Sequence, residues 1–273
     1  GLVQPLRHDS LPNLANVWPE LQSPFYDVGS RYSVPYAVYS TGIGWRSDFV
    51  IDPGARDDPW GIFWDPDYRG RVFVLDDYRA GLQLALLRRG EDINTEDARL
   101  ISEAAEDLYD MTQTTSVRWS LDDYTFLPEG RAWIHQAWSG DMVTAPYYGP
   151  GTPEETAETL GYWFPPDGRG EVNNDVLCVV AGCAHPVLAH RFLDYLLDQE
   201  VAVENFSWVG YQQPVTGLTH EVAAGVYPWL GTPNLASAYV TPAQLAGGYR
   251  QLELSVPADA LWQQAWLQFR SHG

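Results

Sequence analysis

The chain contains no lysine. Its sixteen basic residues are all arginine, and thirty-six acidic residues bring the formal net charge to −20 over 273 residues. Nucleic-acid binding requires basic side chains that neutralise phosphates, so this balance argues against a nucleic-acid partner. A strongly negative protein also concentrates cations near its surface. The charge is therefore compatible with a cationic ligand, and equally compatible with carboxylates that only keep the protein soluble.

The motifs of several enzyme classes are also missing. No GxGxxG or GxxxxGK[ST] motif is present to hold a nucleotide, and neither HExxH nor GxSxG occurs. No apolar run is long enough to cross a membrane. His185 and His190 lie five positions apart at a predicted helix start, where we interpret them as surface and packing residues, and His135 as a core histidine. The sequence therefore predicts no catalytic residue, no cofactor and no metal site.

Only two cysteines are present, Cys178 and Cys183. Their spacing is compatible with a small disulfide loop in an exported protein, and with two thiols in a cytosolic one. Without a nearby histidine they make a poor zinc site. If the protein is exported, we expect the disulfide.

Apolar runs and helical patterns alternate along the chain, which is typical of the α/β class. Strands are predicted at 32–39, 71–75, 132–138 and 175–180, the last as a buried strand, and a bend is predicted at 41–44. Helices are predicted at 80–89, 96–111, 153–159, 186–197, 200–208 and 258–270. On the last helix, Trp262, Trp266 and Phe269 form a stripe that we interpret as core packing.

Three polar or aromatic residues follow predicted strands. Asp77 comes after strand 71–75. Trp138 is the last residue of strand 132–138, and Asp141 follows three positions later. In open α/β sheets, ligands bind beyond the carboxyl ends of the strands. An indole face and a carboxylate together suit a small organic cation. The alternative is structural: Asp77 as a helix N-cap, and Trp138 and Asp141 as a core residue and a turn residue.

With these pieces in order, the chain resembles the spermidine/putrescine-type polyamine-binding receptors of ABC transporters. The resemblance is spread over segments 11–13, 32–36, 60–70, 74–77, 138–141, 196–202 and 210–214. It implies a two-lobed type II periplasmic-binding-protein fold of the α/β class. Without the usual N-terminal βαβα segment, one lobe would be incomplete. The implied lobes are residues 1–38 with 175–219, and residues 39–174 with 220–273.

The resemblance also implies a ligand site between the lobes. The positions that match the family's ligand contacts are Asp77, Trp138, Asp141, Asp175, Tyr211 and Gln251. Two positions depart from the family pattern. Ala80 stands where a glutamate usually holds a terminal amine, and Asn173 stands where an aromatic ring is expected. A different or shorter amine is therefore compatible with this site.

The function implied is non-catalytic capture of a polyamine or similar organic cation outside the cytoplasm, in the periplasm or on a cell-surface lipoprotein. Lobe closure near 38–42, 171–174 and 219–223 would enclose the ligand for delivery to a membrane permease. Two alternatives stay open. One is a secreted hydrolase that acts on glycans through tryptophans and a carboxylate pair. The other is a receptor fragment that binds no small ligand and tends to associate through uncovered sheet.

Overall fold

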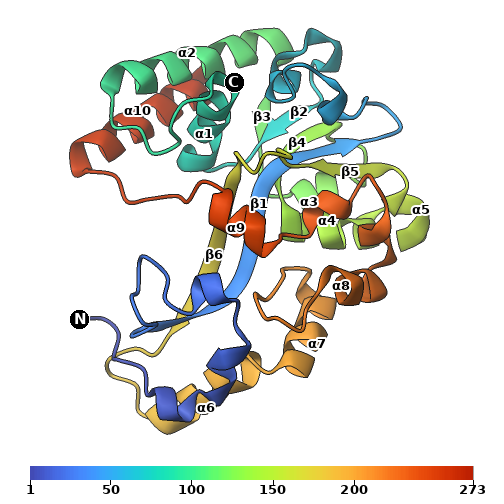
Figure 1. Ribbon diagram of the computed structural model, residues 1–273. Helices are drawn as coiled ribbons and strands as arrows, with labels where there is room; N and C mark the ends of the chain where they lie inside the picture. Colours follow the sequence, from blue (N-terminus) through green and yellow to red (C-terminus); the bar gives the residue numbers. More distant parts are fainter. Residues whose placement is uncertain (273) are drawn as a thin grey trace.

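Two antiparallel strands pass between the two parts of the molecule. The computed structural model describes residues 1–272. Strand β1 (Ser33–Arg46) passes from the part that carries the N-terminus to the part that carries the C-terminus, and β6 (Glu171–Cys178) runs back beside it (Figure 1). Val34, Val38 and Ile43 on β1 are fully buried, as expected for β-branched residues inside a covered sheet. These two strands connect the two halves of the fold.

All six strands belong to one mixed sheet. The other strands are β2 (Val72–Val74), β3 (Arg118–Trp119), β4 (Ile134–Trp138) and β5 (Leu160–Trp163). The order is β3-β2-β4-β1-β5, and β6 pairs with the opposite half of β1. Strand β2 is parallel to β3 and β4, whereas β1 is antiparallel to β4, β5 and β6. The α/β class predicted from the sequence is confirmed.

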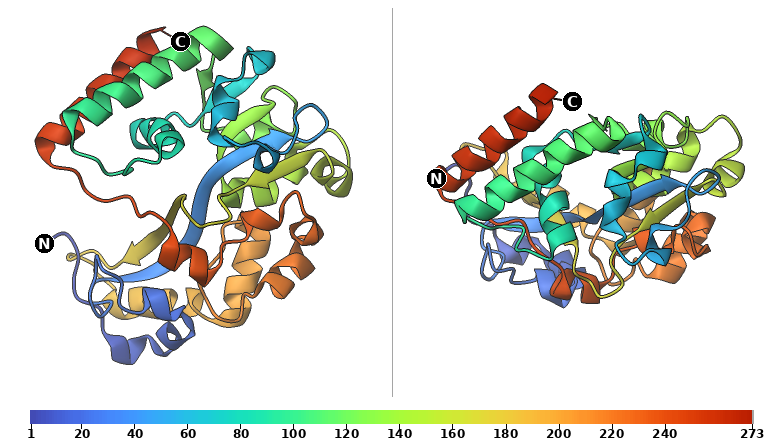
Figure 2. Two further views of the ribbon diagram at one scale, coloured as in Figure 1. Left: turned by 45° about the horizontal axis from the view of Figure 1, so that its top comes forward. Right: turned by 90° about the horizontal axis from the view of Figure 1, so that it is seen from above.

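In the part of the molecule that carries the C-terminus, the sheet is covered by helices α1 (Tyr78–Arg89), α2 (Ala98–Thr115) and α10 (Val256–His272). Figures 1 and 2 show α2 and α10 side by side, and in Figure 1 they lie to the left of β2 and β3. The predicted aromatic stripe of α10 is core packing, with Trp262, Trp266 and Phe269 buried in one cluster with α1 and α2. The guanidinium of Arg79 lies 4.8 Å from the ring centroid of Trp262. No described helix has the length and apolar character needed to span a membrane.

A second hydrophobic core packs on the opposite face of the sheet and continues into the part of the molecule that carries the N-terminus. Its helices are α3 (Asp123–Phe126), α4 (Ser139–Thr144), α5 (Pro153–Ala157), α6 (Pro186–Leu196), α7 (Gln199–Val209), α8 (His220–Val226) and α9 (Pro242–Gly247). Short 3-10 helices lie at His8–Ser10, Pro12–Asn16, Pro19–Leu21, Pro53–Ala55, Trp60–Trp64, Pro66–Tyr68, Ala145–Tyr148, Pro228–Gly231 (η8) and Ala236–Ala238. The N-terminal segment is fixed to α6, since the amide of Asn13 donates to Asp194 at 2.8 Å. Helix α7 ends at Gly210 in a left-handed conformation, as predicted.

Strand β1 continues through the predicted bend at 41–44 to Arg46, and Figures 1 and 2 show it as a curved strand. The two glycines there serve close packing. A Cβ on Gly42 would lie 2.4 Å from the carbonyl oxygen of Trp163, and one on Gly44 would lie 2.6 Å from a Leu127 methyl. Strand β5, which makes the first of these contacts, was not predicted. The glycines therefore allow β5 and the Leu127 side chain to approach β1.

Strand β6 begins at Glu171, four residues before the predicted start, and it is not the buried strand that its apolar letters indicated. Asp175 and Val176 are exposed, whereas Glu171 is buried. The predicted disulfide is not formed in this structure, where Cys178 and Cys183 are both free thiols. Cys178 lies on the exposed half of β6, and Cys183 follows in the next turn, half-buried.

The predicted lobe boundaries fall at one place in the sheet, because Val38 and Asn174 are register partners. The segment after the third boundary contacts both halves. The hydroxyl of Tyr227 donates to the carbonyl of Phe206 on α7, and the indole nitrogen of Trp229 donates to the carbonyl of Val143 on α4. The division into lobes stays a prediction.

Candidate functional site

Strand register brings several of the predicted ligand residues onto one face of the sheet. Trp138 of β4 pairs with Thr41 of β1, and Asp175 of β6 pairs with Ala37. Cross-strand partners share a face, and side chains at alternate positions of a strand share a face too. Trp138 and Asp175 therefore lie on the face defined by positions 37, 39 and 41 of β1. Tyr39, between them, belongs to the same face.

Asp77 reaches the same edge of the sheet from β2. Because β2 and β4 are parallel, their carboxyl ends meet at one edge, as the sequence predicted. The side chain of Gln136 fixes this edge by accepting from the amide of Leu75 at 3.3 Å and donating to the carbonyl of Ala80 at 2.8 Å. Asp77 is also an N-cap, since its Oδ1 accepts from the amide of Ala80 at 2.9 Å. The predicted capping role is confirmed, and it uses one of the two carboxylate oxygens.

Asp141 lies in the first turn of α4 and forms a cluster with Asp123 and Tyr211. Asp123 is fully buried, and within residues 1–272 neither of its carboxyl oxygens has a hydrogen-bond partner at bonding distance and angle. Burial, followed by the negative charge of Asp141, raises the pKa of Asp123 well above its usual range. One retained proton resolves this arrangement, because a protonated Asp123 can donate to the Asp141 carboxylate. A pair that retains this proton on Asp123 would carry one negative charge, on Asp141.

Burial also raises the pKa of Asp141, while hydrogen bonds from Asp123 and from the Tyr211 hydroxyl oppose this shift. Tyr211 in turn is held neutral, because burial and then the charge of Asp141 raise its pKa. A charged oxygen that already accepts two hydrogen bonds is fixed in orientation. Asp141 is thus a half-buried, oriented carboxylate beside a tyrosine ring.

Two tyrosine rings stand next to each other at the centre of the site. The rings of Tyr39 and Tyr211 meet edge to face, with centroids 5.9 Å apart. Tyr211 lies against the backbone of α4, because a Cβ on Gly140 would be 2.5 Å from its ring. Burial, then the charges of Asp175 and Glu171, raise the pKa of Tyr39. Tyr39 therefore lies among the carboxylates that flank the two strands.

A buried polar network occupies the crossing of β1, β6 and α1. Glu171 accepts from the side-chain amide of Asn173 at 2.6 Å. With the nitrogen of its amide facing Glu171, Gln83 donates to both carboxylate oxygens at 3.2 and 3.3 Å and accepts from Gln251 at 3.2 Å. Burial raises the pKa of Glu171, and the negative charge of Asp77 adds to this effect. The predicted residue Gln251 is exposed and joins the site through Gln83.

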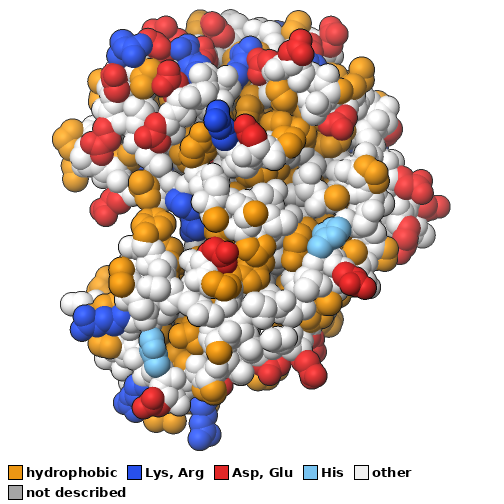
Figure 3. Space-filling model, in the orientation of Figure 1, with side chains coloured by type: hydrophobic (Ala, Val, Ile, Leu, Met, Phe, Trp, Pro, Cys, Tyr) orange, Lys and Arg blue, Asp and Glu red, His pale blue; other side chains and the backbone are white. Residues whose placement is uncertain are grey.

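Asp175 differs from the other carboxylates because it is exposed on β6. The surrounding protein still desolvates it enough to raise its pKa. Next to it, Asn174 donates to the Tyr26 hydroxyl at 2.7 Å and accepts from Arg250. Figure 3 shows the surface indented on its left side, between the part that carries α10 and the part that carries the N-terminus.

Four residues of the cluster were not predicted as site residues: Tyr39, Gln83, Asp123 and Glu171. Tyr39 shares strand parity with Thr41, and this signal would have placed it with Trp138 once the pairing of β1 with β4 was known. Asp123 follows Asp122 at a helix start and resembles an ordinary capping residue. Its complete burial has no sequence signal. Among residues 1–272, no group of three or more His, Cys, Asp or Glu side chains is placed to hold a metal ion.

Comparison with known proteins gives a consistent family. The model of the family described as bacterial extracellular solute-binding protein matches residues 1–226. The spermidine/putrescine-binding periplasmic protein of Salmonella typhimurium is 30% identical over 214 residues, which are 78% of this chain and 58% of that protein. The putrescine/cadaverine-binding protein of Pseudomonas aeruginosa is 27% identical over 227 residues, 78% of this chain and 61% of that protein. The chain thus spans less than two thirds of the length of these relatives.

Solved structures show the same fold. The spermidine/putrescine ABC transporter substrate-binding protein of Streptococcus pneumoniae superposes with a TM-score of 0.78 at 19% identity, over 99% of this chain and 78% of that one. The Tp0655 lipoprotein of Treponema pallidum gives the same TM-score at 20% identity, over 98% and 78% of the two chains. The predicted type II binding-protein fold is therefore confirmed. The family's description as extracellular agrees with the predicted extracytoplasmic location. From the matched residues, the chain belongs to the bacterial extracellular solute-binding proteins.

Proposed function

We propose that this protein is the substrate-binding component of an ABC transporter and that it captures a small organic cation, a polyamine such as putrescine or spermidine. The relatives named above bind spermidine, putrescine or cadaverine by their names. The proposed site comprises Asp77, Trp138, Asp141, Asp175, Tyr211 and Gln251, together with Tyr39.

One observation carries this proposal: aromatic rings and carboxylates share one sheet face at the crossing of the two halves. Trp138 and Tyr39 offer aromatic rings and Asp175 a carboxylate on that face. Asp141 of α4 lies beside Tyr211, whose ring meets that of Tyr39. Ring faces attract the methylene groups and the charge of an alkylammonium ion, and carboxylates accept its hydrogen bonds.

The two strands also suit a receptor that closes around its ligand. We propose that the halves move about β1 near Val38, about β6 near Asn174, and about residues 219–223. The first two positions are register partners, so bending there involves both strands at one level of the sheet. The closed form would then deliver the ligand to a membrane permease.

Calorimetry of the chain with putrescine, spermidine and spermine tests the proposal. We expect one amine to bind with 1:1 stoichiometry. Asp175→Asn and Asp141→Asn should each weaken that amine by about tenfold or more, since a hydrogen bond to a charged group is worth about 1.5–3 kcal/mol. Asp110→Asn is the matched control, because Asp110 is an exposed carboxylate on α2 and the charge change is the same.

Equal affinity in all three variants would place the amine elsewhere. If calorimetry shows no binding of any of the three amines, the proposed ligand class is wrong. Turnover of glycans by the same preparation would then favour a hydrolase, and the absence of both would favour a form of the receptor that holds no small ligand.

A further inference from the structure

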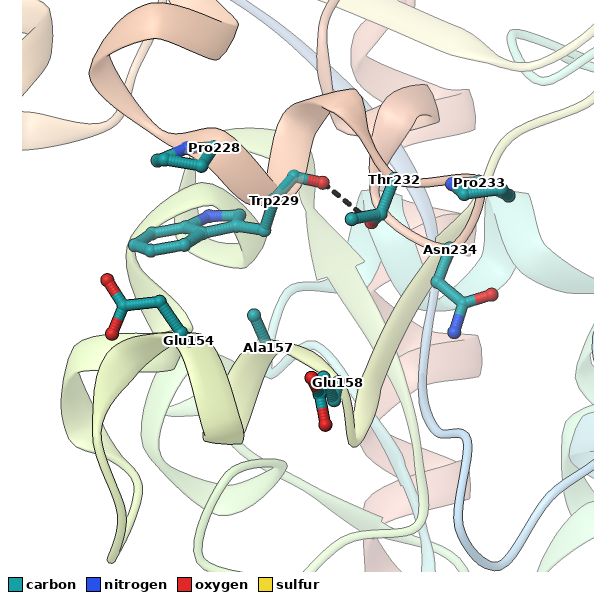
Figure 4. Close-up of a pocket in the computed structure, with 8 residues that line it drawn as sticks. All are labelled: Glu154, Ala157, Glu158, Pro228, Trp229, Thr232, Pro233 and Asn234. Carbon is teal, nitrogen blue, oxygen red and sulfur yellow. Dashed lines mark hydrogen bonds between the residues drawn. The ribbon is translucent and has the colours of Figure 1, made fainter.

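A cavity of about 370 Å³ lies between α5 and the segment 228–234, outside the cation site proposed above. Its size falls within the range of about 300–1,000 Å³ typical of small-molecule pockets. Figure 4 shows Trp229 and Pro228 on one wall and Glu154, Ala157 and Glu158 on the other. None of these residues belongs to the proposed polyamine site. Residues 228–234 also lie beyond the part of the chain that matches the family model.

The walls of this cavity are mainly apolar. Ala157, Pro228, Trp229 and Pro233 contribute to them. The indole nitrogen of Trp229 donates to the carbonyl of Val143 at 2.8 Å. Because the indole nitrogen is already bonded and Trp229 is only 4% exposed, the small part of its ring that reaches the cavity is apolar and aromatic. Such a wall accommodates the hydrocarbon body of a ligand.

Two carboxylates at the mouth give the cavity its charge. Glu154 lies on α5 and Glu158 caps its C-terminal end, and both line the cavity, on either side of Ala157 (Figure 4). The third glutamate of this segment, Glu155, is used in the capping box with Thr152. Within residues 1–272, neither Glu154 nor Glu158 is joined to an arginine, and neither side chain accepts a hydrogen bond that stabilises it. Their charges are therefore available to a ligand.

We infer that this cavity binds an organic ammonium ion with a compact apolar or aromatic body. The ammonium group would lie between Glu154 and Glu158, and the body would pack against Trp229 and the two prolines. A metal ion fits less well, because these two carboxylates have no third ligand of the His, Cys, Asp or Glu type beside them in the described chain. An anion would be repelled. The ligand class differs from a linear polyamine, which carries an ammonium group at each end of its chain and has no compact apolar body.

The test uses the intact chain and 2-phenylethylamine as the probe, with saturation-transfer NMR and calorimetry. We expect the amine to bind, and the neutral 2-phenylethanol and the anionic 3-phenylpropionate to bind at least about tenfold more weakly, because each lacks a charge-assisted hydrogen bond. The double variant Glu154→Gln/Glu158→Gln should lose affinity to a similar extent. Both side chains are exposed, so we expect its circular dichroism and melting temperature to match those of the parent chain.

Helix α7 offers a matched control. Glu200 and Glu204 are also exposed and four positions apart, so Glu200→Gln/Glu204→Gln makes the same charge change away from the cavity. Affinity that falls equally in both double variants would reduce the effect to net charge and overturn the inference. Equal binding of the amine and the alcohol would also overturn it.

Asp175→Asn distinguishes this site from the proposed polyamine site. We expect it to weaken the polyamine and to leave 2-phenylethylamine unaffected. Loss of 2-phenylethylamine in Asp175→Asn would place the probe in the polyamine site and contradict the inference. Conversely, a chain that ignores every polyamine but binds 2-phenylethylamine through Glu154 and Glu158 would contradict the proposed function alone.

Discussion

The raised pKa of Asp123 bears on how much negative charge Asp141 presents to a ligand. Asp123 is fully buried, and its pKa is raised by burial and by Asp141. If both residues were ionised, two like charges would face each other without a donor between them. With the proton on Asp123, Asp141 is free to keep its charge and to accept from Tyr211. Asp123 is therefore a positioning residue for the site.

This arrangement predicts a pH dependence of stability. The unfolded chain releases the Asp123 proton near pH 3.8, whereas the folded chain retains it to higher pH. Between these two values the folded state binds more protons, so the free energy of unfolding falls as pH rises. Asp123→Asn copies the protonated group and removes this loss. We expect the variant to gain stability relative to the parent chain as pH is raised, with the largest gain above the folded-state pKa of Asp123.

Urea unfolding of both proteins at several pH values, from about pH 4 to about pH 8, measures this difference. Asp110→Asn, an exposed carboxylate that shows no such burial, serves as the control and should follow the parent chain. An Asp123→Asn variant whose stability changes with pH in parallel with the parent chain would show that Asp123 does not hold the proton.

At the scale of single elements, helix α4 sets the position of Tyr211. Gly140 lies in its first turn, and a Cβ there would be 2.5 Å from the Tyr211 ring atom nearest the backbone. The nearest ring atom is Cγ, which rotation of the ring does not move, so relief of this contact requires a shift of the Tyr211 backbone. We therefore expect Gly140→Ala to displace Tyr211, to cost about 1–3 kcal/mol of stability by overpacking, and to weaken amine binding.

Helix α8 provides the matched glycine. A Cβ on Gly225 would meet no atom within 4 Å, and alanine is the better helix former by about 1 kcal/mol. Gly225→Ala should therefore leave amine affinity unchanged and slightly raise the melting temperature. Calorimetry and thermal unfolding of both variants make the comparison. Unchanged affinity in Gly140→Ala would mean that the position of Tyr211 does not matter for the ligand.

The elements of this fold were predictable where a local pattern determines them. Asp77 and Trp138 follow apolar strands, and the parallel pairing of those strands brings them to one edge. The length of β1 was not predictable, because Gly42 serves contacts with β5, a strand distant in sequence. The sequence also did not identify Asp123 as the partner of Asp141, because Asp123 is one of thirty-six acidic residues. Only the three-dimensional packing makes it a buried one.

Across the whole molecule, the most unusual surface is the outer side of α6. Leu188, Phe192 and Tyr195 are spaced four and three positions apart, so they form one stripe, and they are 66%, 56% and 55% exposed. His190 and Leu193, on the opposite side, are buried against the N-terminal segment. Contiguous exposed apolar surface favours association. The sequence predicted association through uncovered sheet, and α6 offers a different surface for it.

We therefore expect the isolated chain to associate as its concentration rises, with Leu188→Gln/Phe192→Gln shifting it toward the monomer. Sedimentation velocity over a concentration series measures this shift. Leu267→Gln on α10 is the control, because Leu267 is 67% exposed but lies on the helix at the opposite end of the molecule. The expected effect comes from the stripe, since single exposed apolar residues are common on soluble proteins. A parent chain that stays monomeric throughout, or an equal effect of Leu267→Gln, would contradict this role for α6. Association through α6 would leave the amine site accessible, so 1:1 binding per chain should persist in the associated state.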